Sequence, residues 1–433
     1  MKQEFNLTKK LVREYDRSLD HGGINGTRLA QRLGELSKLG LSESGGSNRV
    51  GFSKEERQAK ELVKKWMRDA GLQVREDGAG NVFARFEGLN NDLPAILSGS
   101  HVDTVPNGGH FDGTLGVLAA LEVVEAWKEL GYNPVRPFEV VIFTDEEGAR
   151  FNGGLTGSEA MMGAFELDKK LLLKDSDGMT FQQVLEEDGL SLDSYEKAGR
   201  DLDEIAAYVE VHIEQGKRLE NANIPCGIVT GIAGPCWLEI TFTGEAGHAG
   251  NTPMNDRKDA LVAASGFIHK IHTLPRVVSE TAVATVGKMS VKPNGVNVIP
   301  GEVQLYVDIR DIYESTRDKL VEVILDEAKM IARSHNVGFK WQETTRVKPV
   351  PIQDKMQEIL SKAFEAHNIK QQYLPSGAGH DAMVLGEKIP VAMLFVRSEN
   401  GISHNPREWT SLDDCVHSVH LLKHCLENLV SEV

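Results

Sequence analysis

The sequence has few cysteines, no long apolar run and less positive than negative charge. Its four cysteines form no C-x-x-C pair and are too few for a disulfide scaffold of 433 residues, so we expect reduced thiols and a cytoplasmic protein. No apolar run reaches the roughly 20 residues that span a bilayer, and the charged segment 1–20 lacks the apolar part of a secretory signal. The formal charge of −16 argues against a surface that binds nucleic acid or an anionic membrane.

The length of the chain indicates two domains, because 433 residues exceed the usual size of one hydrophobic core. A capping box, Ser53 with Glu56, opens an amphipathic helix that ends at Gly71. Further apolar patterns predict strands at 72–75, 82–86, 95–100 and 138–144, and a helix at 114–130. This alternation predicts an α/β domain with a mixed, largely parallel sheet and helices on both faces.

The pattern changes after about residue 226. The segments 237–244 and 302–310 alternate apolar and polar residues, as strands with one solvated face do. Helical patterns cover 256–273 and 315–335. These elements predict a small α+β domain with helices on one face of an antiparallel sheet.

Beyond about residue 345 the sequence returns to the first pattern. A helix is followed by the apolar strand 391–396, and a last helix begins at about residue 411. We therefore predict one α/β domain made of the separated segments 1–216 and 341–433. The residues 217–340 form a second domain inserted into it.

Imidazole and carboxylate side chains follow several predicted strands of the α/β domain. Ligands of open α/β sheets bind beyond the carboxyl ends of the strands, so these side chains are the candidates for a site. The like charges crowded in TDEEGARF (144–151) are costly unless a cation lies among them, although an acidic turn in solvent is the ordinary alternative. The candidates are His101, Asp112, Glu146, Glu147, His212 and His404.

A mixed set of histidines and carboxylates suits divalent Zn, Mn, Co or Ni. Five such ligands are too many for one four-coordinate ion, whereas two ions that share a carboxylate would use them all. Asp103 follows His101 by two residues and is a candidate to hold the second ring nitrogen of that histidine. One histidine after a strand is more often structural, but agreement among four such positions favours a metal site. The spacing leaves open whether Glu146 or Glu147 is a ligand.

A set of motifs resembles a known family. The segments GSHVDTVPNGGHFDGTLGVLAA, FTDEEGARF, VEVHIEQG, GEAGHAGNTPM, SGAGHDA and ISHNPRE are similar to those of the amidohydrolases related to the M20 metallopeptidases, in particular their hydantoinase/carbamoylase branch. The resemblance runs over nearly the whole chain, and HIEQG marks the branch. The related aminopeptidases and aminoacylases usually carry a carboxylate where His212 stands.

The resemblance implies a centre with two divalent ions. His101, Asp112 and His212 would bind metal, with Asp112 bridging the two ions, and Glu147 and His404 would complete the coordination. It also implies that Glu146, the neighbour of Glu147, is the general base that accepts a proton from the attacking water.

The resemblance implies roles for the inserted domain as well. From chemistry alone, His248 on a glycine-flanked loop could support an oxyanion, and Arg310 at a strand end could clamp a carboxylate, although a turn histidine and a surface ion pair are the alternatives. The family implies that His248 acts across a homodimer interface and that Asn297 and Arg310 hold the substrate carboxylate. Gln215 would orient the scissile group, and the inserted domain would dimerise and close as a lid. Asp145 receives no role.

The expected activity is hydrolysis of the ureido C–N bond of an N-carbamoyl-L-amino acid, which yields the amino acid, ammonia and carbon dioxide. An allantoate amidohydrolase is the nearest alternative, and a β-ureidopropionase is a third within the branch. An aminoacylase or dipeptidase is disfavoured by His212. A small-molecule-binding protein that has lost catalysis is the alternative from another class, and the presence of all five proposed ligands and the proposed base opposes it.

Overall fold

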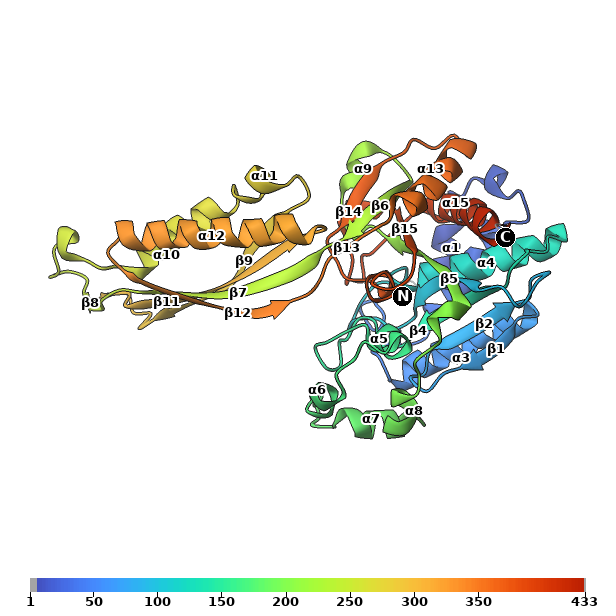
Figure 1. Ribbon diagram of the computed structural model, residues 1–433, viewed down its shortest axis with the longest axis horizontal. Helices are drawn as coiled ribbons and strands as arrows, with labels where there is room; N and C mark the ends of the chain where they lie inside the picture. Colours follow the sequence, from blue (N-terminus) through green and yellow to red (C-terminus); the bar gives the residue numbers. More distant parts are fainter. Residues whose placement is uncertain (1–5, 432–433) are drawn as a thin grey trace. The chain divides into compact units, whose positions relative to one another are not determined.

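The computed structural model describes residues 6–431, which form two compact units (Figure 1). Helices and strands alternate in the first unit, and a smaller α+β unit interrupts it in the sequence. Unit 1 consists of the chain up to Val229, Ile352–Leu374 and the chain from His380 onward, and unit 2 consists of Thr230–Pro351 and Pro375–Gly379.

The boundaries of the two units differ from those expected from the sequence. The segment 217–229 belongs to unit 1, because strand β6 (Cys226–Ile232) begins there, paired with β15 (Val391–Val396). The residues after 340 remain in unit 2 up to Pro351, because β12 (Gly338–Arg346) is a strand of its sheet. Polar residues of β12 gave no sign of this strand in the sequence.

Unit 1 is built on a mixed sheet with the strand order β1-β2-β4-β3-β5-β15-β6. The central strands β4, β3, β5 and β15 are parallel, and antiparallel pairs flank them. Their residues are mostly apolar and almost all buried, as in α/β proteins generally. The carboxyl ends of these strands therefore meet at one edge of the sheet. The bounds are β1 Gln73–Glu76, β2 Val82–Phe86, β3 Ala95–His101, β4 Phe138–Phe143 and β5 Ile205–Ile213.

Helices cover both faces of this sheet, which confirms the predicted α/β fold (Figure 1). On one face α4, α13 and α15 pack together, and Trp127 of α4 meets Phe138 of β4 edge to face at 5.3 Å. On the other face lies α14, where the backbone N–H of Ala382 donates to the carboxylate of Glu210 on β5. None of the helices within residues 6–431 is long and apolar enough to cross a membrane. The bounds are α4 Thr114–Leu130, α13 Asp354–Ala366, α14 Asp381–Leu385 and α15 Leu412–Ser431.

A small aromatic core forms beside the sheet, within the connection between β4 and β5. Phe181 lies at its centre and makes edge-to-face contacts with Phe52, Phe151 and Tyr195 at centroid distances of 6.1, 5.7 and 5.2 Å. Phe151 is the last residue of TDEEGARF, so this core anchors the end of the acidic turn. The helices nearby are α3 Lys54–Asp69, α5 Thr156–Met162, α6 Leu167–Leu171, α7 Phe181–Glu187 and α8 Leu192–Glu196.

The N-terminal segment, with α1 (Leu7–Leu11) and α2 (Gly26–Leu36), is fastened to α4 and α15. Arg28 forms an ion pair of 2.6 Å with the buried Glu122 of α4. His420 of α15 lies with Nε2 2.9 Å from the carbonyl oxygen of Leu19 and stacks on the ring of His21 at 4.2 Å.

Unit 2 is an antiparallel sheet in the order β12-β7-β11-β9, with α10 and α12 packed on one face, as predicted (Figure 1). Alternate residues of β11 are buried against these helices, which explains the apolar-polar alternation in its sequence. The strands β8 and β10 pair antiparallel and form a separate two-stranded ribbon. The bounds are β7 Gly234–Thr243, β8 Gly247–His248, β9 Val283–Lys292, β10 Val298–Ile299, β11 Glu302–Asp311, α10 Ala260–Ile271, α11 Pro275–Val278 and α12 Glu314–Ser334.

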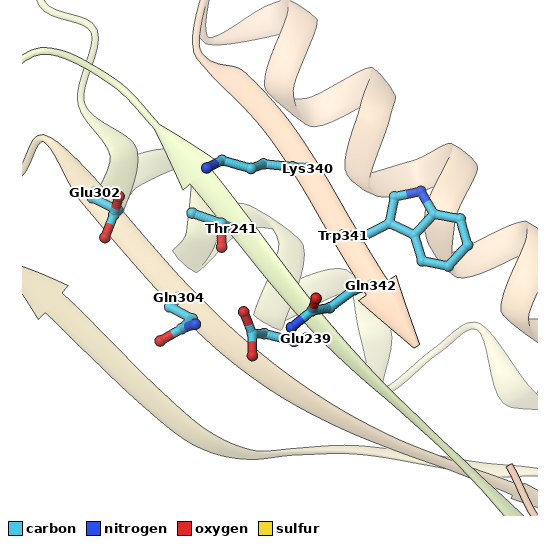
Figure 2. A pocket seen from close by; sticks show the side chains of 7 residues that line it. All are labelled: Glu239, Thr241, Glu302, Gln304, Lys340, Trp341 and Gln342. Atoms are coloured by element: carbon cyan, nitrogen blue, oxygen red, sulfur yellow. The ribbon is translucent and has the colours of Figure 1, made fainter. Parts of the chain in front are cut away.

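The uncovered face of this sheet carries a polar pocket (Figure 2). Within it Tyr306 donates a hydrogen bond of 2.8 Å to Glu239, and Lys292 pairs with Glu302 at its rim, also at 2.8 Å. The carboxylates of the pocket therefore have partners within the sheet. None of the candidate residues lines the pocket, which is formed by Glu239, Thr241, Glu302, Gln304, Lys340, Trp341 and Gln342.

The contact of His420 predicts acid sensitivity of unit 1. Burial lowers the pKa of His420 to about 4, and the neighbouring His21 and His367 act in the same direction. Between pH 6.5 and about 4 the unfolded chain binds a proton that the folded chain excludes, so stability is full above pH 6.5 and falls as the pH decreases. We expect His420→Gln, which keeps a donor for Leu19, to remove roughly 1 kcal/mol of this loss, allowing for solvent screening.

Thermal unfolding of the metal-free protein between pH 4.5 and 7.5 measures the effect. The melting temperature of the variant should depend less steeply on pH than that of the wild type. Parallel slopes would show that His420 does not contribute to the acid sensitivity.

Candidate functional site

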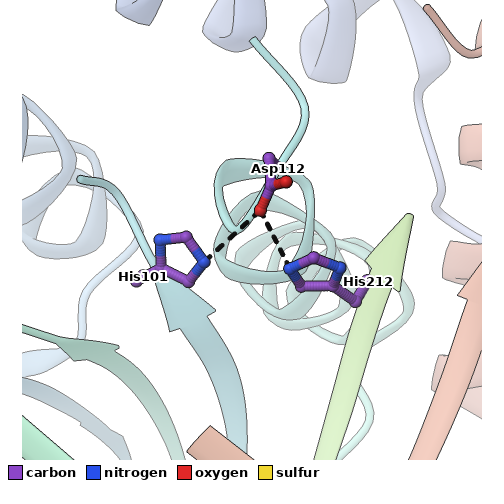
Figure 3. A group of neighbouring side chains, drawn as sticks. All are labelled: His101, Asp112 and His212. Atoms are coloured by element: carbon purple, nitrogen blue, oxygen red, sulfur yellow. Dashed lines mark ion pairs between the residues drawn. The ribbon is translucent and has the colours of Figure 1, made fainter. Parts of the chain in front are cut away.

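Three of the candidate side chains meet at the carboxyl edge of the sheet of unit 1 (Figure 3). His101 is the last residue of β3, His212 lies one residue before the end of β5, and Asp112 lies just before α4. Oδ1 of Asp112 is 3.6 Å from Nε2 of His101 and 3.1 Å from Nε2 of His212. All three side chains are buried, and they form a group that could hold a metal ion.

The ring orientations of the two histidines fit a cation. Nδ1 of His101 lies 3.1 Å from the carbonyl oxygen of Asp103, and Nδ1 of His212 lies 3.0 Å from that of Ile213. Each Nδ1 therefore carries a proton and donates it, and each Nε2 turns toward Asp112. A neutral Nε2 facing a carboxylate would set two lone pairs against each other, and Nε2 of His101 has no hydrogen-bond partner among the described residues. A divalent ion between these atoms satisfies them all.

A second group shares Asp112 with the first. Nε2 of His404 lies 3.1 Å from Oε2 of Glu147 and 3.6 Å from Oδ2 of Asp112. The first group uses Oδ1 of Asp112. The two oxygens of this carboxylate therefore face two different groups of candidate metal ligands. This is the arrangement expected of a carboxylate shared by two ions. His404 is 49% exposed, so the second group is open to solvent on one side.

The charges of the site are unbalanced toward the negative. Burial disfavours a charge on His101, but Glu146, Asp103 and Asp112 outweigh it and raise the pKa of the ring well above its usual value. Burial raises the pKa of Glu146 well above its usual range, with His101 acting in the opposite sense. The hydrogen bond with Glu147 raises the pKa of His404 to about 9. Positive charge is therefore stabilised at this edge of the sheet, whether it is carried by protons or by ions.

The backbone of the acidic turn is held by Asp103. Its two carboxylate oxygens accept the backbone N–H groups of Glu146 and Glu147, at 3.2 and 3.1 Å. The carboxylate lies 3.4 Å from Nδ1 of His101, but the carbonyl of Asp103 is the nearer acceptor for that ring. Glu146 points back to the first group, with Oε2 3.6 Å from Nε2 of His101. The structure thus separates the two glutamates, one beside each group.

Asp145, which the sequence left without a role, shapes the turn. It adopts a left-handed φ of 54°, and its Oδ2 accepts a hydrogen bond of 2.7 Å from Thr156. A Cβ at Gly51 would lie 2.0 Å from its Oδ1, so only glycine fits there. Asp145 is fully buried, and its backbone geometry turns the next two residues toward the site. Gln215 and His404 share this left-handed conformation, with φ of 55° and 53°.

Three residues that contact Asp112 or its backbone come from two loops far apart in the sequence. Gln215 donates from Nε2 to Oδ2 of Asp112 at 2.8 Å. Ser403 donates to the same oxygen at 2.6 Å. Glu408 accepts the backbone N–H of Asp112 at 3.2 Å. Ser403 and Glu408 were not among the candidates from the sequence, although both lie in the motif ISHNPRE.

His380 and Glu210 lie close to the two histidines and were not among the candidates from the sequence. The ring of His380 lies 4.4 Å from that of His212, and Phe395 closes the other side of His380 at 5.8 Å. Glu210 of β5 accepts hydrogen bonds from Ser100 at 2.7 Å and from the backbone of Ala382 at 2.9 Å. Glu210 lies two residues before His212 on β5, so the two side chains point to the same face of the sheet. This spacing was the sign in the sequence that Glu210 lies near the site.

The remaining candidates belong to unit 2. His248 and Asn297 lie together at the β8–β10 ribbon, where the backbone N–H of Ala249 donates to the carbonyl of Asn297 at 3.0 Å. Nδ1 of His248 accepts the backbone N–H groups of Gly250 and Asn251, at 3.1 and 3.2 Å. The ring proton is therefore on Nε2, and the exposed ring offers a hydrogen-bond donor to solvent.

Arg310 lies near the end of β11. Its guanidinium binds Asp308 through Nε and Nη2, at 2.9 and 2.7 Å, and Nη1 donates to the carbonyl of Gly377 at 2.7 Å. A substrate carboxylate bound at Arg310 would compete with Asp308. The sequence shows Asp308 as a neighbouring acid in VDIRD, but it does not indicate that Asp308 pairs with Arg310.

Comparisons with known proteins identify the family of the chain. The sequence profile of peptidase family M20/M25/M40 matches residues 97–428, and the chain belongs to this family. Within it the chain is similar to an N-carbamoyl-L-amino acid amidohydrolase of Geobacillus stearothermophilus, with 44% identity over 406 residues that cover 94% of this chain and 99% of that protein. An allantoate amidohydrolase of Bacillus subtilis (strain 168) is 37% identical over 87% of this chain and 91% of its own length.

A solved structure supports the same branch. An amidase of the hydantoinase/carbamoylase family from Burkholderia multivorans matches with a TM-score of 0.88 and 35% identity, over 94% of this chain and 98% of that one. The predicted resemblance to the hydantoinase/carbamoylase branch is thereby confirmed.

The two glycines that flank α4 offer a test of the site. Gly113 has a φ of 63°, and a Cβ there would lie 2.4 Å from the ring of His101. Gly131 has a φ of 65°, and nothing lies within 4 Å of a Cβ placed there. We expect Gly131→Ala to cost about 1 kcal/mol of stability, from backbone conformation alone, and to leave metal binding intact.

Gly113→Ala should cost about 1–2 kcal/mol for the same reason and also displace His101 and reduce bound metal. Melting temperatures and elemental analysis of the dialysed proteins measure both effects. Equal metal content in the two variants would contradict the assigned position of His101.

Proposed function

We propose that the protein is a metal-dependent amidohydrolase that cleaves the ureido C–N bond of N-carbamoyl-L-amino acids. The observation that carries this proposal is Asp112, whose two carboxylate oxygens face two separate groups of donors. The similarity to N-carbamoyl-L-amino acid amidohydrolases, at 38–44% identity for three of them, supports the choice of substrate.

The donor atoms suit two divalent ions, of Zn, Mn, Co or Ni. His101 and His212 would hold one ion, Glu147 and His404 the other, and Asp112 would bridge them. Ions in such a centre supply an activated water and polarise the carbonyl of the substrate.

Glu146 would transfer the proton. It lies beside the first group with 10% of its side chain exposed, 3.6 Å from Nε2 of His101, and is not a member of either group of candidate ligands. Its raised pKa suits a general base, which must accept a proton from the attacking water and release it to the leaving nitrogen. Water and the ureido group are thereby converted to the amino acid and carbamic acid, which decomposes to ammonia and carbon dioxide.

Residues of unit 2 would bind the rest of the substrate. Arg310 would exchange Asp308 for the substrate carboxylate, with Asn297 as a further donor, and Nε2–H of His248 would stabilise the oxyanion. Gln215 would release Asp112 and orient the scissile group. These roles are proposed together with closure of unit 2 as a lid and with a homodimer formed through that unit, in which His248 serves the partner's site.

The role of Glu146 predicts the behaviour of Glu146→Gln. The amide keeps the size and the neighbours of the side chain but cannot accept the proton, so turnover should fall by at least about 10³-fold. The metal content should stay near that of the wild type. Ammonia release and elemental analysis test both points, and a variant that keeps most of its activity would exclude Glu146 as the base.

Arg310 makes a prediction about substrate binding. Replacement by lysine removes the bidentate geometry, so the KM for N-carbamoyl-L-amino acids should rise by roughly tenfold or more, with a smaller change in kcat. The conservative variant Asp308→Asn frees Arg310 from its internal partner and should not raise KM. Steady-state kinetics of both variants decide whether Arg310 contacts the carboxylate.

A substrate panel separates the proposed activity from its alternatives. Ammonia release from N-carbamoyl-L-amino acids, allantoate, N-carbamoyl-β-alanine and N-acetyl amino acids should favour the first group. A preference for allantoate of more than about tenfold in kcat/KM, about 1.4 kcal/mol of transition-state binding, would assign the protein to that reaction instead. Absence of bound ions and of any hydrolysis after addition of Mn, Co, Ni or Zn would favour a binding protein.

A further inference from the structure

Glu408 joins the two loops that carry Asp112 and His404. Its Oε1 accepts the backbone N–H groups of Phe111 and Asp112, at 2.8 and 3.2 Å. Its Oε2 lies 3.2 Å from Oγ of Ser403, the residue before His404. The side chain is buried, with 4% of its surface exposed. One carboxylate thus contacts segments that are almost 300 residues apart in the sequence.

Ser403 completes the link to Asp112. Its single hydroxyl proton is directed at Oδ2 of Asp112, at 2.6 Å, which is the nearer of its two carboxylate neighbours. Asp112 is therefore held from two sides, at its backbone by Glu408 and at its carboxylate by Ser403. Oδ2 is also the oxygen that faces His404.

The loop before Asp112 is shaped to admit the carboxylate of Glu408. A Cβ at Gly109 would lie 2.0 Å from the carboxyl carbon of Glu408, closer than any real contact. The second glycine of NGGH is therefore required by Glu408 and not by its own backbone angles, since its φ is not in the left-handed region. This fit is independent of the hydrogen bonds and indicates a built cradle.

We propose that Glu408 is a positioning residue that fixes Asp112 and the loop of His404 in the relative placement that two ions sharing one carboxylate require. Glu408 does not belong to either group of candidate ligands and acts through the backbone N–H groups of Phe111 and Asp112. Removal of a residue that orients a metal ligand commonly weakens metal binding by 10–100-fold. The inference rests on the proposed function, because it concerns the same pair of ions.

The matched variants are Glu408→Ala, Glu408→Gln and Asp77→Ala. Alanine leaves two buried backbone N–H groups without an acceptor, whereas the oxygen of glutamine still accepts them and its NH₂ can donate to Ser403. Asp77 is the control, because it accepts the backbone N–H groups of Ala79 and Asn81, both at 2.9 Å, and contacts none of the candidate ligands. It reaches the acidic turn only indirectly, through Asn81, which accepts the backbone N–H of Thr144. Its loss tests the general effect of removing a carboxylate that holds a turn.

The experiment titrates each metal-free protein with Mn²⁺ or Co²⁺ in competition with a chelator and records the melting temperature without metal. We expect Glu408→Ala to bind one or both ions at least about tenfold more weakly and Glu408→Gln to stay within about threefold of the wild type. Asp77→Ala should lose melting temperature but keep wild-type affinity. The absorption spectrum of bound Co²⁺ should change only in Glu408→Ala.

Several outcomes overturn the inference. They are unchanged affinity in Glu408→Ala, equal weakening in Glu408→Ala and Glu408→Gln, or equal weakening in Asp77→Ala. If Glu408→Ala does not fold, Glu408→Asp takes its place, because it keeps the carboxylate but shortens its reach to the backbone N–H groups of Phe111 and Asp112. An affinity within threefold of the wild type would then reject the role. A wild-type protein that binds no ions would instead reject the proposed function itself.

Discussion

The constraint on which unit 1 depends is the gathering of buried carboxylates at one edge of its sheet. Asp103 and Asp112 are buried, Glu146 and Glu147 are nearly so, with 10% and 6% of their side chains exposed, and all four lie in the loops that follow β3 and β4. Two unit charges 4 Å apart repel by about 4 kcal/mol at an effective dielectric constant of 20, so such a cluster cannot stand without compensation. The structure compensates for this repulsion in three ways. Backbone N–H groups donate to Asp103, and the rings of two histidines turn toward Asp112. The candidate ligand atoms also lie close enough together that a cation could bind among them.

Three residues at the site have a left-handed backbone conformation. Asp145, Gln215 and His404 take a left-handed conformation that costs about 1–2 kcal/mol per residue. Each lies in a loop that begins where a parallel strand ends, so the strain brings the side chains of the site inward from a rigid sheet. The ends of the strands thus determine where the residues of the site lie, and the left-handed residues of the loops determine which way their side chains point.

The sequence suffices to predict the parts of the fold that depend on local patterns. Apolar runs predict α4 and β15 with the bounds that the structure has, because all of β15 and all but the last turn of α4 are almost completely buried. β12 escapes prediction, since GFKWQETTR alternates poorly and its strand is defined by pairing with β7. The short helices between β4 and β5 escape for a similar reason, because an aromatic core made of distant residues stabilises them.

Prediction of the site follows the same division. The residues that end strands could be found, because the topology of an α/β sheet brings strand ends together whatever the details of the loops. Ser403 and Glu408 could not, because their partners are chosen by the packing of two loops that the sequence does not relate. Their signal was limited to membership of ISHNPRE, where only the histidine has an obvious chemical use.

The position of β15 in the sheet has a consequence for biosynthesis. This strand lies between β5 and β6 but is made after nearly nine-tenths of the chain, and His404 and Glu408 follow it. On the ribosome, the carboxylates at the ends of β3 and β4 must therefore wait beside an incomplete sheet until the last segment emerges. The group of His101, Asp112 and His212 is translated well before His404, so the group that includes His404 is the later of the two to have all its residues in the chain.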